Sequence, residues 1–144
     1  MSTTAKVSWV EGALFVAEAG SGHTLTMDGS PDVGGRNLAA RPMEMVLIGM
    51  GGCTAIDVMM ILRKGRETVT DCLVELSAER ATAEPKVFTR IHVHYKVSGR
   101  GLTSAKVERA IKLSKEKYCS ASIMLGQVAA ITHDFEVIDE TVPA

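Results

Sequence analysis

One stretch, RPMEMVLIGMGGCTAIDVMMILRKG, constrains the fold of this chain more than any other. It runs from Arg41 to Gly65, and between Glu44 and Arg63 its only charged residue is Asp57. Proline near the start, an acidic residue in the first turn, basic residues in the last turn and a glycine after the end are typical of a helix. The pattern predicts a helix of more than five turns with almost no polar face.

A helix that is apolar on nearly every side must be buried, either in a protein core or in lipid. The apolar run barely reaches the ~20 residues that a bilayer requires, and Asp57 would cost about 3 kcal/mol at mid-depth. We therefore predict the central core helix of a soluble protein that does not enter a membrane. Since so short a chain can hardly cover this helix on every side, we also expect an obligate homodimer.

Composition excludes several classes of function. A chain of 144 residues indicates a single domain, 1–144, and a net charge of −1 gives no electrostatic footprint for nucleic acid. The first residues lack the apolar core of a signal peptide, and three cysteines are too few for a disulfide scaffold, which together favour a reducing cytoplasm. No metal-binding motif or tight His/Cys cluster is present in the sequence, so we expect neither a metal nor another cofactor.

Three glycines interrupt the predicted helix just before Cys53, at Gly49, Gly51 and Gly52. Each costs up to about 1 kcal/mol relative to alanine, so they need a structural reason. In one interpretation they let another backbone pack closely, and Cys53 is a small buried hydrophobe. In the other, Gly49 and Gly52 leave open space around a reactive thiol held on a rigid helix.

The rest of the chain predicts alternating strands and helices. In order, we expect a meander of short strands from Lys6 to Met27, a glycine-rich loop over residues 28–40, the long helix, paired strands over residues 68–81 and 86–99, a helix from Lys106 to Lys117 capped by Thr103, a short apolar helix after Cys119, and an edge strand over residues 131–139. The inner stripe of the Lys106–Lys117 helix comprises Val107, Ala110, Ile111 and Ser114.

The strand over residues 86–99 alternates between two faces. One face holds Val87, Thr89, Ile91, Val93, Tyr95 and Val97, and the other holds Phe88, Arg90, His92, His94 and Lys96. His92 and His94 therefore share a face, two residues apart. A zinc pair there lacks a visible third ligand, so we interpret the pair as part of a solvated sheet surface.

Cys119 precedes the last short helix, in Cys119-Ser120-Ala121-Ser122. The start of a helix carries partial positive charge and unpaired N–H groups, which favour a thiolate. Cys72 lies inside a strand among apolar neighbours and is predicted to be a packing residue.

Two motifs together resemble the OsmC/Ohr family of thiol-dependent peroxidases. The first is Pro42-Met43-Glu44 followed by an apolar run that contains Gly51-Gly52-Cys53, and the second is the segment KYCSAS around Cys119. The doubled glycine and the KYCSAS form are most similar to the YhfA-type branch. The resemblance covers essentially the whole chain in element order.

The resemblance implies an α+β fold in which two chains form an intertwined homodimer, with two long central helices between antiparallel sheets. It implies a peroxidatic role for Cys53 and a resolving role for Cys119. The substrate would be an organic hydroperoxide, and an external dithiol would reduce the resulting disulfide.

The resemblance also implies an activating arginine from the loop before the helix, where Arg36 and Arg41 both qualify. In the Ohr branch a glutamate directly follows the motif proline, whereas here Met43 takes that place and Glu44 follows one position later. We keep Glu44 as a candidate for positioning the arginine. Asp57 lies one turn after Cys53, and an unpaired carboxylate there would raise the pKa of the thiol.

Two functions therefore stay open at the level of sequence. The first is a hydroperoxide reductase that uses Cys53 and Cys119. The second is a dimer of the same fold that binds a ligand or senses redox state with little turnover, for which the methionine-rich helix could line an adaptable apolar pocket.

Overall fold

The structure, a computed structural model that describes residues 2–141, divides into two compact units, Met1–Val46 and Leu47–Ala144. The first unit is an antiparallel meander of β1 (Ala5–Glu11), β2 (Leu14–Ala19) and β3 (Thr24–Met27). A loop with one 3₁₀ turn, Pro31–Val33, follows these strands. The predicted meander and the long glycine-rich loop are both confirmed.

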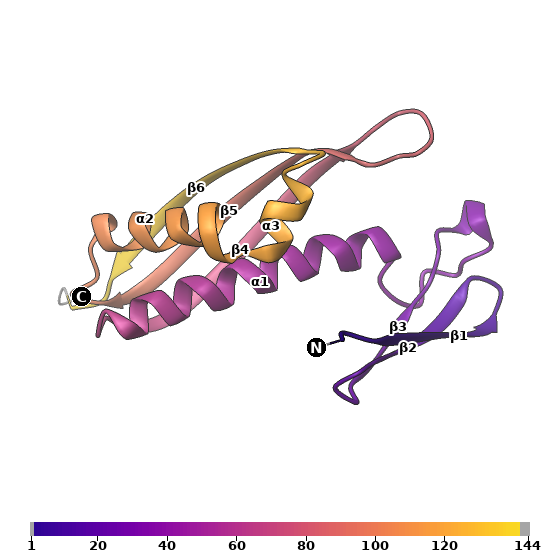
Figure 1. Cartoon of the computed structure of the whole chain (residues 1–144), viewed down its shortest axis with the longest axis horizontal. Helices are drawn as coiled ribbons and strands as arrows, with labels where there is room; N and C mark the ends of the chain where they lie inside the picture. The colour runs from indigo at the N-terminus through magenta and orange to yellow at the C-terminus, as the bar shows by residue number, and fades with distance from the viewer. Residues whose placement is uncertain (1, 142–144) are drawn as a thin grey trace. The chain divides into compact units, whose positions relative to one another are not determined.

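The second unit is a three-stranded sheet that carries helices on one face (Figure 1). Its central strand β5 (Phe88–Arg100) pairs antiparallel with β4 (Thr68–Arg80) and parallel with β6 (Ala130–Asp139). The helices are α1 (Pro42–Lys64), which begins in the first unit, α2 (Ser104–Leu113) and α3 (Ser120–Leu125). The predicted edge strand is therefore confirmed, and so is the mixed α and β class.

The predicted apolar face of β5 is confirmed at Ile91, Val93, Tyr95 and Val97, which are all buried. Phe88 contradicts the prediction, because it is buried although simple alternation assigns it to the polar face. The pairing of β4 with β5 shifts register between Glu79 and Arg80, so Arg80 rather than its neighbour pairs with Phe88. A bulge of this kind breaks the two-residue period and turns the next side chain to the other face.

Helix α1 has two apolar stripes on opposite faces. The stripe facing the sheet is buried and comprises Met50, Thr54, Val58 and Leu62. Gly51 borders it, and a Cβ atom there would lie 2.6 Å from Leu76 Cδ1 on β4, so this glycine permits the close packing of the helix on the sheet. A Cβ atom at Gly49 or Gly52 would meet no described atom within 4 Å, outside the backbone of the helix itself.

The second stripe of α1 is exposed in a single chain. Ile48 is 58% exposed, Ile56 63% and Met60 50%. The expectation that one chain buries this helix on all sides is therefore wrong, and about half of its apolar surface awaits a partner. By length and hydropathy α1 would suffice to cross a membrane, a test that the core helix of a soluble protein also passes.

Buried hydroxyl groups join α1 to the helices behind it. Thr103 caps α2 by accepting from the Lys106 N–H at 3.4 Å, and the predicted inner stripe of this helix is buried at Val107, Ala110, Ile111 and Ser114. The segment Ser114–Tyr118 then widens into a π turn. The hydroxyl of Thr54 lies 2.7 Å from that of Tyr95 and 2.8 Å from that of Ser114.

These contacts predict a measurable cost for Thr54→Val, which keeps the shape of the side chain but removes its hydroxyl. The hydroxyls of Tyr95 and Ser114 each lose a buried partner, so the free energy of unfolding should fall by about 1–3 kcal/mol. Urea denaturation followed by circular dichroism, at one fixed protein concentration, measures the change. The exposed Thr89→Val serves as the matched control and should change it by less than about 0.5 kcal/mol. Equal stability of both variants would contradict the described network.

Candidate functional site

Three side chains from distant parts of the chain meet beside the middle of α1. The sulfur atoms of Cys53 and Cys119 and a carboxylate oxygen of Asp57 all lie within 4.8 Å of one another. Cys53 and Asp57 are one helical turn apart on α1, at the border between its buried and exposed stripes, and both are half-buried. Cys119 precedes the first residue of α3 and is fully buried. The fold therefore brings the two predicted cysteines together.

Cys119 is held by the first turn of α3. Its sulfur accepts hydrogen bonds from the Ser122 hydroxyl at 3.0 Å and from the Ser122 N–H at 3.3 Å. Burial nevertheless raises the pKa of the Cys119 thiol, and the neighbouring Cys53 also raises it, against the lowering effect of these hydrogen bonds. The prediction that the helix start makes Cys119 a ready thiolate is therefore wrong, because desolvation of the charged form outweighs the helix start.

Asp57 ends a chain of four polar groups that crosses the core. The Ser114 hydroxyl donates to Asp57 Oδ2 at 3.0 Å. Because each hydroxyl has one proton, Thr54 must then donate to Ser114 and Tyr95 to Thr54. All donors point toward the carboxylate, which stabilises its ionised form. Among the described residues of the second unit, Asp57 has no ion-pair partner.

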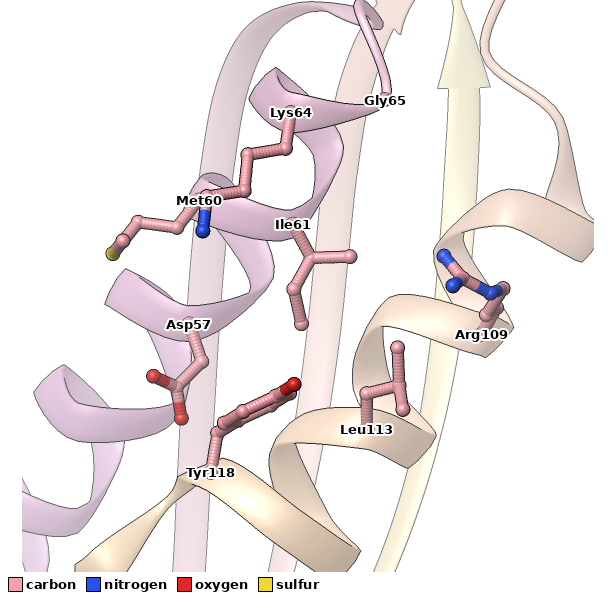
Figure 2. Close-up of a pocket in the computed structure, with 8 residues that line it drawn as sticks. All are labelled: Asp57, Met60, Ile61, Lys64, Gly65, Arg109, Leu113 and Tyr118. Atoms are coloured by element: carbon pink, nitrogen blue, oxygen red, sulfur yellow. The ribbon is translucent and has the colours of Figure 1, made fainter.

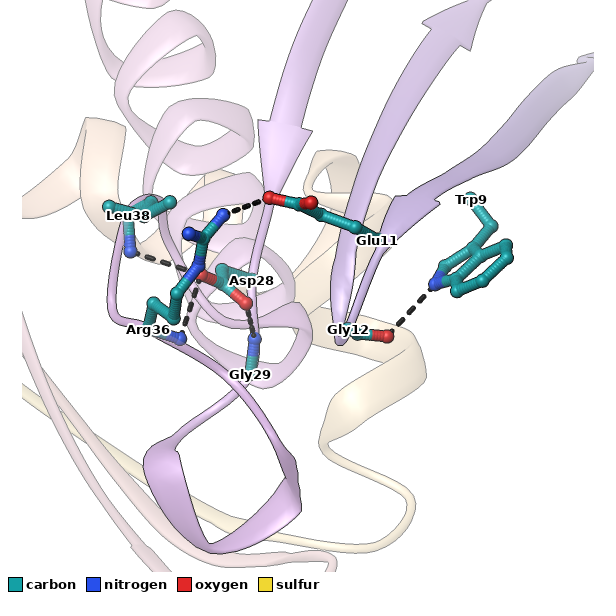
Figure 3. A network of polar contacts seen from close by, with 7 residues as sticks. All are labelled: Trp9, Glu11, Gly12, Asp28, Gly29, Arg36 and Leu38. Carbon is teal, nitrogen blue, oxygen red and sulfur yellow. Dashed lines mark hydrogen bonds and ion pairs between the residues drawn. The ribbon is translucent and has the colours of Figure 1, made fainter.

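Three of the predicted site residues lie in the first unit. The Arg36 guanidinium pairs there with the Glu11 carboxylate, and both side chains are largely exposed (Figure 3). The loop that carries Arg36 is organised by the buried Asp28, whose carboxylate accepts from the N–H groups of Arg36 and Leu38, both at 3.1 Å, and of Gly29 at 2.7 Å. These backbone hydrogen bonds, that of Leu38 foremost, lower the pKa of Asp28.

Arg41 and Glu44 form the start of α1. The Arg41 carbonyl accepts the first helical hydrogen bond, from the Met45 N–H, and the Glu44 carboxylate accepts from the Arg41 N–H at 2.8 Å. This is the glutamate half of a capping box, so Glu44 satisfies one of the unpaired donors at the helix start. The catalytic role of Glu44 stays a prediction, and its position is explained by capping alone.

A cavity of about 420 Å³ opens next to Asp57 within the second unit. Figure 2 shows it between the last turns of α1 and the helices on the other side, with Asp57, Lys64, Arg109 and Tyr118 around an apolar wall of Met60, Ile61 and Leu113. We interpreted Arg109 from sequence as part of a solvated helix face. It is exposed, and it also gives this cavity a positive charge.

The two histidines lie on the sheet face opposite the helices, as predicted, and are partly exposed. His92 Nε2 and His94 Nδ1 are each 2.8 Å from Asp134 Oδ1, which was not foreseen because Asp134 belongs to β6. The hydrogen bond with Asp134 raises the pKa of His94. Cys72 is half-buried on β4, and burial followed by the nearby Asp71 raises its pKa, in keeping with a packing residue.

Comparisons with known proteins agree with this geometry. The sequence model of the OsmC-like protein family matches residues 34–134. Protein YhfA of Escherichia coli K12 is 50% identical over 134 residues, which are 93% of this chain and 97% of that protein. A structural genomics structure has 48% sequence identity and a TM-score of 0.85, covering 94% of this chain and 98% of its own.

A fourth comparison shows the fold alone. The organic hydroperoxide resistance protein OsmC of Legionella pneumophila superimposes with a TM-score of 0.71 at 17% identity, over 95% of this chain and 98% of that one. The family match covers most of the chain, and the identity to YhfA extends over nearly all of it. This protein therefore belongs to the OsmC-like family.

Proposed function

We propose that this protein is a cysteine-dependent peroxidase that reduces organic hydroperoxides. The observation that carries the proposal is the meeting of the Cys53 and Cys119 sulfurs within 4.8 Å, although 65 residues separate them in sequence (119 − 53 − 1). Cys53 is the partly exposed member and can meet a substrate, whereas the buried Cys119 can only meet Cys53. This asymmetry fits a peroxidatic and a resolving cysteine.

The proposed reaction has three balanced steps. The Cys53 thiolate attacks the outer oxygen of the hydroperoxide, the O–O bond breaks, and the alkoxide takes a proton and leaves as an alcohol. Cys53 is then a sulfenic acid, and the Cys119 thiol displaces its hydroxyl group as water to form a disulfide. An external dithiol reduces the disulfide and is itself oxidised.

A cation is needed to favour the thiolate beside Asp57, since the carboxylate opposes a second negative charge. We propose that Arg36 or Arg41, from the segment before α1, supplies it, as the family resemblance implies. The structural neighbour from Legionella pneumophila, described as an organic hydroperoxide resistance protein, supports this class of substrate. We further propose that the protein acts in a reducing cytoplasm, where its cysteines stay free.

We also infer that residues 1–144 act as one domain of a homodimer. The exposed stripe of Ile48, Ile56 and Met60 supports this, since so much apolar helix surface is rarely left in water. Exposed Trp9 and Val7 on β1 show that the first unit also lacks cover for its apolar side chains. A second copy supplies matching apolar surfaces.

The homodimer predicts a concentration-dependent mass. Sedimentation equilibrium of the purified protein at micromolar concentration should give twice the chain mass. Ile56→Lys should shift the protein toward monomer by at least about tenfold in the dissociation constant, because a charge enters an apolar contact. Ile138→Lys, on the exposed edge strand β6, is the matched control and should leave the mass unchanged. A folded monomer of the unaltered chain would refute the dimer.

The peroxidase proposal is tested by cysteine variants that react with cumene hydroperoxide in the presence of dithiothreitol. Cys53→Ser should abolish peroxide consumption, and Cys119→Ser should leave Cys53 as a sulfenic acid that dimedone labels. Cys72→Ser is the matched control and should retain full consumption. If the unaltered protein consumes no peroxide and dimedone labels nothing in Cys119→Ser, the proposal fails.

In that case a second function takes its place, in which the protein binds a small molecule without turnover. The cavity beside Asp57 favours this alternative, because its volume of about 420 Å³ lies in the range of small-molecule sites. Its apolar wall with Arg109 and Lys64 would suit an organic anion.

A further inference from the structure

The group of Cys53, Asp57 and Cys119 has the donor set of a metal site as well as that of a redox pair. Within residues 2–141 it is the one set of three histidine, cysteine or acidic side chains whose donor atoms lie within 4.8 Å of one another. Two sulfurs and one carboxylate oxygen are three of the four ligands that a tetrahedral zinc ion takes. We propose that these residues bind one zinc-class cation, Zn²⁺ or Cd²⁺, per chain.

Hydrogen bonds from outside the group already fix two of the three donors. Ser122 donates twice to the Cys119 sulfur, and Ser114 donates to Asp57 Oδ2. Outer contacts of this kind orient the ligands of zinc sites and raise their affinity. The other oxygen of Asp57 accepts no hydrogen bond from the described residues, so it is available to a cation.

The spacing requires only a small adjustment. In a tetrahedral site with zinc–sulfur bonds of about 2.3 Å, the two sulfurs lie ~3.8 Å apart. The donors described here are separated by no more than 4.8 Å, and the half-buried Cys53 can rotate on the helix surface. The fourth position would take a water molecule on the exposed side of Cys53, where the nearby Gly52 carries no side chain.

Charge balance favours a divalent cation that prefers sulfur. Binding displaces the protons of both thiols, so M²⁺ replaces two H⁺ and the site holds two thiolates, a carboxylate and the ion with a net charge of −1. The cation removes the repulsion among the three groups, which no other described cation within the second unit neutralises at Asp57. Magnesium and calcium prefer oxygen ligands and should not compete.

The test is a titration of the reduced, full-length protein with CdCl₂ under anaerobic conditions. Thiolate-to-cadmium charge-transfer absorption in the ultraviolet should rise to a plateau at one cadmium per chain, and ZnCl₂ should remove it while MgCl₂ does not. Cys53→Ser should weaken binding by more than the ~10–100-fold loss that follows removal of an outer-shell partner. Asp57→Asn should weaken it by about tenfold.

Matched controls are available on β4. Cys72→Ser and Asp71→Asn each remove a thiol or a carboxylate outside the group and should bind cadmium like the unaltered protein. Cys53 is half-buried, so its serine variant should fold even if the corresponding change at the buried Cys119 does not. Absence of the cadmium band, or an equal band in Cys53→Ser, would overturn the site; an undiminished affinity in Asp57→Asn would remove the carboxylate from it.

The metal proposal does not depend on the proposed peroxidase activity, because the titration contains no peroxide. A protein that consumes no peroxide yet binds cadmium in this pattern would keep the metal site and lose the peroxidase. A protein that consumes peroxide yet shows no cadmium band would do the reverse.

Discussion

The buried hydroxyl chain from Tyr95 through Thr54 and Ser114 to Asp57 is the interaction on which the site depends. It ties α1 to β5 and to the turn that follows α2, and this turn delivers Cys119 to Cys53. An apolar helix can slide or rotate on an apolar sheet at little cost, whereas hydroxyls that lose their partners in the core are expensive. The chain thus selects one register of α1 and so fixes where the two sulfurs meet.

The same arrangement creates an electrostatic conflict. All hydroxyl donors point at Asp57 and favour its negative charge, while burial opposes charge on the adjacent Cys119. A negative group beside two thiols resists thiolate formation unless a cation approaches. Both proposals made for this protein resolve the conflict with positive charge, either from an arginine that activates Cys53 or from a bound metal ion that holds both sulfurs.

Much of the fold could be predicted from local sequence signals. The caps and charges at the ends of α1, the alternation in β5 and the stripe of α2 each follow from residues close together in the chain. The burial of Phe88 could not be predicted, because a bulge depends on pairing with a distant strand. The exposed stripe of α1 was missed for the opposite reason, since composition shows that a helix is apolar without showing what covers it.

For the site, sequence predicted the two cysteines and the shared face of Cys53 and Asp57, but not the hydroxyl chain. Ser114 in the inner stripe of α2 was the available signal, because a polar residue at a buried position requires a partner. Its partners lie 57 and 60 residues away, and only the folded chain identifies them. The role of Glu44 as a helix cap, by contrast, was readable from its position three residues after Arg41.

The central claim, that the fold holds the Cys53 and Cys119 sulfurs together apart from any catalytic activity, is tested most directly by oxidation with diamide. The reduced protein is treated briefly, remaining thiols are alkylated, and peptides are mapped by mass spectrometry. The structure predicts a Cys53–Cys119 disulfide within one chain and an alkylated Cys72. A disulfide that includes Cys72, or full alkylation of Cys53 and Cys119 in the folded protein, would contradict it.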